Sequence, residues 1–426
     1  MIEVLVNFCL EMKLLIIISD FYHHQHSTIS VILNQQSAIY NQKCYNRRMS
    51  TSIDPERQEK AKVYARIQRR LMLVDLGIGA VYLLAWLLSG GSLALRSGLQ
   101  AWTTSPWLLV AGFTIIFGGI YVIIDLPLSY YSEFTLPHRF DQSVETLGGW
   151  IKDQLIGLAI AGVLGLVMLE AVYWLLRISP GFWWLWAGIL LVFFTVILSN
   201  LAPVLIMPLF NKFVPLGEEH AELAERLTRL AARAGTKVQG VFTFDMSKRT
   251  KAANAGLTGM GNTRRIVLGD TLIREFTPDE IETVLAHELG HQVHQDIVLG
   301  IAFGSLINLV GLFLAAVVLR WGAAAMGAAG PSDPATLPLF GLVMGAFGLV
   351  TMPLTAGWSR WRESLADQYA LESTHNSSAF ASALARLANQ NLSEADPEPW
   401  VEFLLYSHPA LSKRIRMAEG YEGGHQ

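Results

Sequence analysis

Cysteine is nearly absent from this sequence. The 426 residues include two cysteines, Cys9 and Cys44, and both lie before residue 49. No disulfide and no thiolate metal site can therefore form in the rest of the chain, so any metal ion there needs nitrogen and oxygen ligands.

Charge is also scarce. Charged residues make up 16% of the chain and hydrophobic residues 52%. Average soluble domains contain about 25% charged residues, so the deficit indicates contact with lipid. The net charge of −3 provides no basic surface of the kind that nucleic-acid binding requires. We therefore expect a membrane protein with the lipid bilayer as a partner and no nucleic-acid partner.

The first 48 residues differ in composition from the rest, being rich in Asn, Gln, Ile and Tyr. Their apolar stripe is interrupted by Glu11 and Lys13, and no clear small-residue cleavage site follows. A signal peptide or membrane anchor is thus the less favoured alternative. We expect a tail over residues 1–70, of which 1–48 lie outside the mature chain and translation starts at Met49.

Six segments reach the roughly 20 apolar residues that cross a bilayer. They are 71–89, 106–124, 155–176, 182–207, 297–319 and 337–358. The first four form a block over 71–207 and the last two a hairpin over 297–358, without a charged residue inside either segment of that hairpin. The sequence predicts an integral, multi-pass protein of mainly α class.

Basic residues in the connections predict the orientation. Six Lys or Arg lie in 51–70, but the 90–105, 177–181 and 321–336 connections carry one, one and none. The positive-inside rule then places both termini and residues 208–296 on the cytoplasmic side. Six spans return both termini to one side, so the count agrees with the charges.

Residues 208–296 interrupt the apolar pattern and predict a cytoplasmic α+β domain. Segment 218–235 has helical spacing and ends at a glycine, whereas 238–247 and 265–270 read as strands. The polar, glycine-rich stretch between the strands predicts a loop or an exposed edge strand. A further helix is expected to start at Thr277, with Pro278 in its first turn and Glu280 closing a capping box.

That last helix contains VLAHELGHQVHQD, residues 284–296, just before the fifth span. Positions i and i+4 share a helix face, so His287 and His291 can direct both imidazoles at one point. Glu288 is placed beside them to act as a general base. This is the HExxH pattern of zinc metalloproteases, and it predicts one Zn²⁺ per chain.

A catalytic zinc site usually has three protein ligands. His294 is displaced around the helix from the other two histidines and is more readily a solvated or outer group. Segment 358–372 offers Glu363 and Asp367 on one helix face, on the same side of the membrane. Glu363 as third ligand and Asp367 as the partner that orients a histidine make a coherent site. Spacing alone leaves open which carboxylate binds, and an exposed acidic face is the alternative.

HELGH, followed about 70 residues later by ExxxAD, resembles the membrane gluzincin metalloproteases typified by the CAAX prenyl protease of type 1. The likeness extends over most of the chain from about residue 70. PLFNKFVPL (208–216), NAGLTGMGNTRRIVLGDTL (254–272) and SHPALSKRIR (407–416) are similar to segments of that family. The resemblance implies a zincin-like catalytic domain built from 208–296 and 359–426, in a six-span, bacterial-type relative.

The resemblance also implies roles for individual residues. His287, His291 and Glu363 would hold Zn²⁺, with Glu288 as general base. Asn254 and Ala255 would lie on an edge strand that pairs with the substrate backbone. His408 and Arg414 would stabilise the oxyanion.

Two features depart from the family. The eukaryotic members have a seventh span, and they carry a histidine five residues after the second HExxH histidine, where this chain has Asp296. We expect neither difference to touch the zinc ligands, and both bear on prenylated substrates.

The sequence thus predicts a zinc-dependent metalloendopeptidase that hydrolyses membrane-associated peptide or protein tails. Prenylated CAAX tails are the substrates that the resemblance implies. A quality-control protease for membrane proteins uses the same chemistry and is the alternative enzyme. A non-catalytic, zinc-binding membrane scaffold is the alternative from another class, although Glu288 has no structural reason to be present in it. The oligomeric state has no signature in the sequence.

Overall fold

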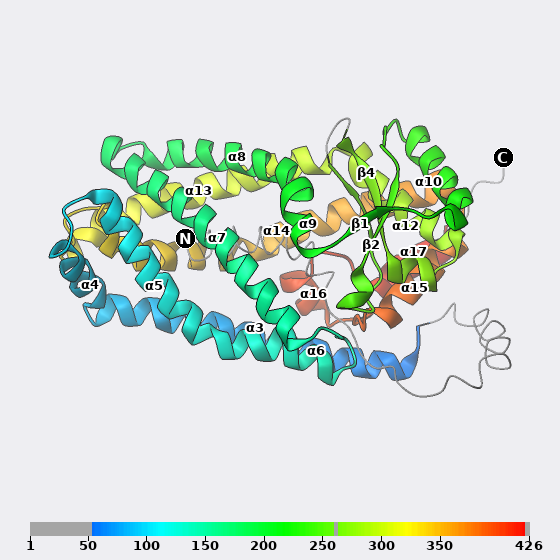
Figure 1. Cartoon of the computed structure of the whole chain (residues 1–426), viewed down its shortest axis with the longest axis horizontal. Coiled ribbons are helices and arrows are strands. Elements are labelled where there is room, and N and C mark those ends of the chain that lie inside the picture. Colours follow the sequence, from blue (N-terminus) through cyan, green and yellow to red (C-terminus); the bar gives the residue numbers. More distant parts are fainter. Residues whose placement is uncertain (1–52, 260–262, 422–426) are drawn as a thin grey trace.

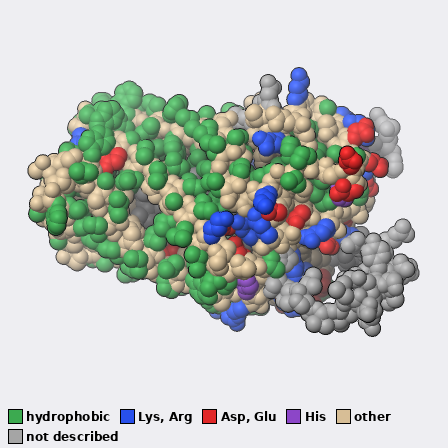
Figure 2. All heavy atoms as spheres, viewed as in Figure 1, with side chains coloured by type: hydrophobic (Ala, Val, Ile, Leu, Met, Phe, Trp, Pro, Cys, Tyr) green, Lys and Arg blue, Asp and Glu red, His purple; other side chains and the backbone are tan. Residues whose placement is uncertain are grey.

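The computed structural model describes residues 53–259 and 263–421. The predictions for residues 1–48 and for a start at Met49 lie outside this part of the chain. The described part is elongated, with long helices at one end and a small sheet with shorter helices at the other (Figure 1). Hydrophobic side chains cover most of the helical end in the view of Figure 2, while most charged side chains gather over the sheet end.

Among the described residues, six helical runs of 28 to 41 residues are long and apolar enough to cross a membrane, which confirms the six predicted spans. They are α3 (Pro55–Leu88), α5 with η1 and α6 (Pro106–Arg139), α7 (Leu147–Ile178), α8 with η2 and α9 (Trp183–Phe210), α13 (Asp296–Ala325), and η6 with α14 (Pro334–Thr374). Roughly 20 residues suffice to span the hydrocarbon layer, so these helices project beyond it. The projecting ends of α13 and α14 carry site residues.

The runs that are made of more than one element combine α-helix with π-helical or 3₁₀-helical turns. Their parts are α5 (Pro106–Ser129), η1 (Tyr130–Thr135), α6 (Leu136–Arg139), α8 (Trp183–Leu201), η2 (Ala202–Ile206), α9 (Met207–Phe210), η6 (Pro334–Thr336) and α14 (Leu337–Thr374). A proline follows each π-helical turn closely: Pro137 comes after η1 and Pro208 after η2. A proline lacks the N–H that an α-helix needs and clashes with the carbonyl four residues earlier, which explains the wider turns.

An aromatic and aliphatic cluster holds the long helices together. Phe113 and Phe117 of α5 stack with ring centroids 5.8 Å apart, and Trp183 of α8 lies 6.0 Å from Phe340 of α14. Leu312 of α13 is buried in the same cluster. A short helix, α4 (Gly91–Gln100), joins α3 to α5. The cluster therefore fixes the α13–α14 hairpin among the other helices.

In the part of the chain that the structure describes, the sheet has four short strands in the order β1-β2-β4-β3. The strands are β1 (Phe213–Pro215), β2 (Val241–Phe244), β3 (Ala255–Thr258) and β4 (Arg265–Gly269). β2 and β4 are parallel, and the other two pairs are antiparallel. The two predicted strands are confirmed in β2 and β4, and the proposed edge strand is β3. β1 was not predicted, since three residues are too few to show a pattern.

Shorter helices make up the rest of this end of the molecule. They are η3 (Glu218–His220), α10 (Ala221–Arg233), η4 (Met246–Lys248), α11 (Asp270–Glu275), α12 (Pro278–Val293), α15 (Ser377–Gln390), α16 (Pro399–Leu405) and α17 (Leu411–Glu419). The predicted capping box of α12 is present: Thr277 N donates to Glu280 at 2.8 Å, and Glu280 N donates to the Thr277 hydroxyl. One buried core includes Leu227, Leu268, Leu285 and Phe380. Residues before and after the membrane hairpin thus share one hydrophobic core.

Candidate metal centre

Helix α12 carries the two histidines. Leu285, Ala286 and Leu289 have no exposed surface and anchor α12 in the core. His287 and His291 lie one turn apart on α12, with ring centroids 4.8 Å apart and planes at 87°. Their Nε2 atoms are 3.2 Å apart. The predicted convergence of the two imidazoles is present.

Glu363 is brought to this pair by helix α14. α12 and α14 lie close together at Gly290, where an added Cβ would lie 2.9 Å from Cα of Ala366. Only a residue without a side chain fits between the two backbones at this distance. Gly290 lies inside HELGH, and Ala366 follows Glu363 by three residues, so this contact places the carboxylate opposite the histidines.

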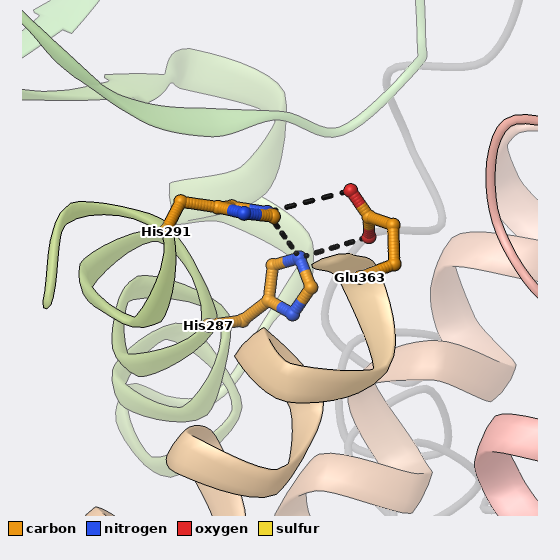
Figure 3. Close-up of side chains that lie close together, drawn as sticks. All are labelled: His287, His291 and Glu363. Atoms are coloured by element: carbon orange, nitrogen blue, oxygen red, sulfur yellow. Dashed lines mark hydrogen bonds and ion pairs between the residues drawn. The ribbon is translucent and has the colours of Figure 1, made fainter. Parts of the chain in front are cut away.

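The three side chains converge (Figure 3). Nε2 of His287 is 3.3 Å from Oε2 of Glu363, and Nε2 of His291 is 3.4 Å from Oε1. Ligand atoms about 2.0–2.2 Å from a tetrahedral zinc ion are spaced about 3.3–3.6 Å apart. Buried Oε2 of Glu363 accepts no hydrogen bond from the described residues. These residues can hold a metal ion, and the donor set and spacing fit zinc.

Asp367 lies beside the first histidine. Its Oδ1 lies 2.8 Å from Nδ1 of His287, which leaves Nε2 facing the other donors. Arg414 of α17 donates from Nε and Nη2 to the two carboxylate oxygens at 2.7 and 2.6 Å. Asp367 is 1% exposed, so this pairing neutralises a buried charge.

Asp296 is the corresponding carboxylate beside the second histidine. Its Oδ2 lies 2.7 Å from Nδ1 of His291, and Nε of Arg362 donates to Oδ1 at 2.8 Å. The expectation that this departure from the family leaves the zinc ligands untouched is wrong. Because α12 ends at Val293 and Gln295 takes a left-handed conformation, the chain turns back and brings the Asp296 carboxylate to His291.

The sequence signal was stronger for Asp367 than for Asp296. Asp367 could be assigned from its i+4 spacing to Glu363, but Asp296 shares no helical register with His291. Arg362 was not singled out from the sequence. A carboxylate five residues after the second histidine was the available signal for Asp296.

Glu288 is the acid beside the donors. It is half-buried and does not belong to the three residues that can hold the metal. Burial raises the pKa of Glu288, and the nearby His287 and His291 only partly offset that rise. A raised pKa makes the carboxylate a stronger proton acceptor, as general-base work requires.

The surrounding charges also act on the histidines. Burial alone would lower the pKa of His287, but Asp367 and Glu363 outweigh it and raise the pKa. The same opposition at His291, with Asp296 as its hydrogen-bond partner, raises its pKa to about 10. Protons therefore compete with a metal ion for both imidazoles.

His408 lies beside Glu363, and its side chain is partly exposed to solvent. Its Nε2 is 3.3 Å from Oε1 of Glu363, and its side chain is 45% exposed. Nδ1 lies 2.9 Å from the Ser407 hydroxyl. Burial lowers the pKa of His408. His294, by contrast, faces Tyr369 edge-on at 6.2 Å and is outside the donor group.

The predicted substrate-binding residues lie at the edge strand. Ala255 begins β3, which pairs with β4 on one side and forms an edge of the described sheet. The Asn254 carbonyl accepts from Gly269 N at 2.7 Å. β3 packs against α12, so this edge runs beside the helix that carries the histidines.

Comparison with known proteins decides the family. Residues 35–212 match the family domain described as the CAAX prenyl protease N-terminal region with five membrane helices, and residues 218–422 match peptidase family M48. The chain is 30% identical to an uncharacterized metalloprotease, YhfN, of Bacillus subtilis, covering 86% of this chain and 87% of that one. The chain belongs to peptidase family M48.

Two further relatives of this M48 protease are fungal. CAAX prenyl protease 1 of Saccharomyces cerevisiae is 34% identical over 71% of this chain and 70% of its own length. The crystal structure of S. mikatae Ste24p matches with a TM-score of 0.76 at 27% identity, covering 88% of this chain and 91% of that one. The predicted family, fold class and peptide-bond hydrolysis are thereby confirmed. This M48 protease is an integral, multi-pass membrane metalloprotease.

Proposed function

We propose that this M48 protease is a zinc endopeptidase that cuts the tails of proteins at the cytoplasmic membrane face, with prenylated CAAX tails as substrates. The observation that carries the proposal is the convergence of His287, His291 and Glu363 next to Glu288, at the sheet end of a six-helix membrane protein. The name of the yeast relative, CAAX prenyl protease 1, supports the substrate class.

His287, His291 and Glu363 would bind the zinc ion through Nε2, Nε2 and the carboxylate. A bound zinc ion would supply a Lewis acid and lower the pKa of a water molecule to about 7. Asp367 and Asp296 hold the two imidazoles in the tautomer with Nε2 free to coordinate. Glu288 takes the proton from the attacking water and delivers it to the leaving amine.

The oxyanion needs positive or hydrogen-bonding groups beside it. His408 is half-exposed and stands on the open side of Glu363, which supports it as the donor to the developing oxyanion. Arg414 directs two of its nitrogens at Asp367. We propose that it contributes its charge to the site while it holds that carboxylate.

The substrate would bind as an added strand. β3 is an edge strand beside α12, and Asn254 and Ala255 stand at its start. Backbone pairing there would extend the peptide without reading its side chains. The basic residues that gather in 51–70 support a cytoplasmic site, which a protease-protection assay of a C-terminal tag in sealed vesicles tests.

The deciding experiment is cleavage of a farnesylated CAAX peptide by detergent-purified protein, with zinc content measured. We expect the wild type to cut, and Glu288→Gln to keep its zinc while its kcat falls by about 10²–10⁴-fold, because an amide cannot accept the proton. The same peptide without its farnesyl group is the matched substrate control.

Two outcomes would contradict parts of the proposal. If wild type and Glu288→Gln hold zinc equally and neither cuts the peptide, the prenylated substrate is wrong, and misfolded membrane proteins are tested next. Equal cleavage by both proteins would remove Glu288 from the mechanism.

A further inference from the structure

We propose that Arg360 is a positioning residue, which holds the turn that presents His408 to Glu363. The proposal rests on the proposed function, because it gives His408 a place in the reaction. Arg360 lies on α14, one turn before Glu363, and touches none of the three donor residues in the described contacts. Its effect on the site passes through the backbone of the turn.

The turn that carries His408 has little structure of its own. It lies between α16, which ends at Leu405, and α17, which begins at Leu411. The His408 side chain is 45% exposed, and one of its ring nitrogens lies beside Ser407 of the same turn while the other lies beside Glu363. Its distance from Glu363 therefore depends on where the backbone of the turn is held.

Arg360 holds the start of this turn through three backbone carbonyls. Nη1 donates to the carbonyls of Glu402 and Tyr406 at 2.8 and 2.6 Å, and Nη2 donates to that of Phe403 at 3.2 Å. The last carbonyls of a helix lack partners within the helix and carry partial negative charge, so a guanidinium suits this end of α16. The planar fork of arginine reaches these carbonyls from two nitrogens in a fixed geometry, whereas lysine presents all its donors from a single nitrogen.

The other side of the turn is held by Glu402. Its buried Oε1 accepts from Ala410 N at 3.0 Å, two residues after His408. Tyr406 is held at its other end as well, because its hydroxyl donates to Glu394 at 3.1 Å. His408 is thus carried by a short loop with both ends fixed, and Arg360 joins the first end to the helix of Glu363.

One helix then sets both positions: α14 carries Glu363 itself and, through Arg360, the turn of His408. A displacement of about 1 Å at a reacting group can cost on the order of 100-fold in rate. Replacement of Arg360 should therefore slow turnover without removing a metal ligand or the substrate-binding strand.

The test is a double-mutant cycle with Arg360→Lys and His408→Ala on the farnesylated peptide. We expect Arg360→Lys to lower kcat by about 10-fold or more, with KM and zinc content within about twofold of the wild type. In the His408→Ala background the same change should cost less than about twofold, because the group that it positions is gone. Arg416→Lys, an exposed change on α17, is the matched control and should leave kcat unchanged.

An equal loss of kcat from Arg360→Lys in both backgrounds would overturn the proposal, as would a rise in KM with kcat unchanged. A readout without substrate separates this proposal from the proposed function. Release of the turn should speed carbethoxylation of His408 by diethylpyrocarbonate at least about threefold, while exposed His375 reacts as in the wild type. If the wild type cuts nothing, the proposed function fails, and an unchanged labelling rate of His408 would overturn the role of Arg360 independently.

Discussion

At the scale of single residues, the centre is built from two matching arms. Each histidine that can hold the metal has its Nδ1 beside an aspartate, and each aspartate accepts from an arginine: Asp367 with Arg414, and Asp296 with Arg362. Such partners set the tautomer of the ligand and raise its basicity, and their loss typically costs 10- to 100-fold in metal affinity.

The arm on His291 predicts the effect of Asp296→Ala. Without this carboxylate the His291 ring loses its fixed orientation, and Arg362 is left with a buried charge. We expect zinc affinity to fall by about 10- to 100-fold, measured by competition with a chelator. Asp279→Ala removes an exposed carboxylate from α12 and should leave the affinity unchanged. Equal affinities for the wild type and Asp296→Ala would show that this arm does not support the ligand.

At the scale of elements, the decisive contact is the crossing of α12 and α14. The histidines and Glu363 come from different helices, and their spacing depends on how closely the two backbones meet at Gly290 and Ala366. The capping box at Thr277 fixes where α12 begins. The glycine of HELGH therefore has a packing role that is separate from the chemistry of its neighbours.

Gly290→Ala tests this crossing. The added methyl would meet the Ala366 backbone at 2.9–3.0 Å, so the helices must separate. Overpacking of this kind typically costs about 1–3 kcal/mol, and we expect a lower melting temperature together with less zinc per chain. Gly300→Ala on α13, where nothing lies within 4 Å, is the control and should change neither quantity. Full zinc occupancy in Gly290→Ala would show that the site tolerates a wider crossing.

At the scale of the whole molecule, the α13–α14 hairpin divides the centre into two parts. One part precedes the hairpin and carries the histidines. The other consists of the projecting end of α14, which carries Glu363 and Asp367, and of the segment after it, which carries His408 and Arg414. The shared core, which includes Leu285 and Leu384, already joins them. A bound metal ion would add a second link and so stabilise the folded domain against unfolding.

The stability that a bound metal ion adds to the fold should depend on pH. In protein stripped of metal, the raised pKa of His291 means that its protonated form stabilises the fold. That contribution is complete below about 6.5, the ordinary histidine pKa, and is lost as pH rises toward about 10. Metal binding has the opposite trend, because both imidazoles must first lose their protons.

We therefore expect the gap in melting temperature between zinc-loaded and chelator-treated protein to widen from pH 6 to pH 8. Differential scanning fluorimetry in detergent measures it at each pH. The double variant His287→Ala, His291→Ala is the control, and its gap should be near zero throughout. A gap in the wild type that narrows over this range would contradict the assignment of the two histidines as metal ligands.

The sequence by itself determined whatever depends on near neighbours along the chain. Runs of apolar residues marked six spans, and the i, i+4 spacing of His287 and His291 placed two donors on one helix face. It also named Glu363 and Asp367 together, since these are likewise i, i+4 on α14. Helical geometry alone settles such relations.

Only the tertiary structure decided which groups meet across elements. The spacing left Glu363 and Asp367 interchangeable, and their heights along α14 relative to Gly290 put Glu363 opposite the Nε2 atoms and Asp367 behind Nδ1. The pairing of Asp296 with His291 needed a left-handed turn at Gln295. The turn that carries His408 is held by Arg360, which comes from α14. These contacts arise from helix packing between residues far apart in the chain, which no local period encodes.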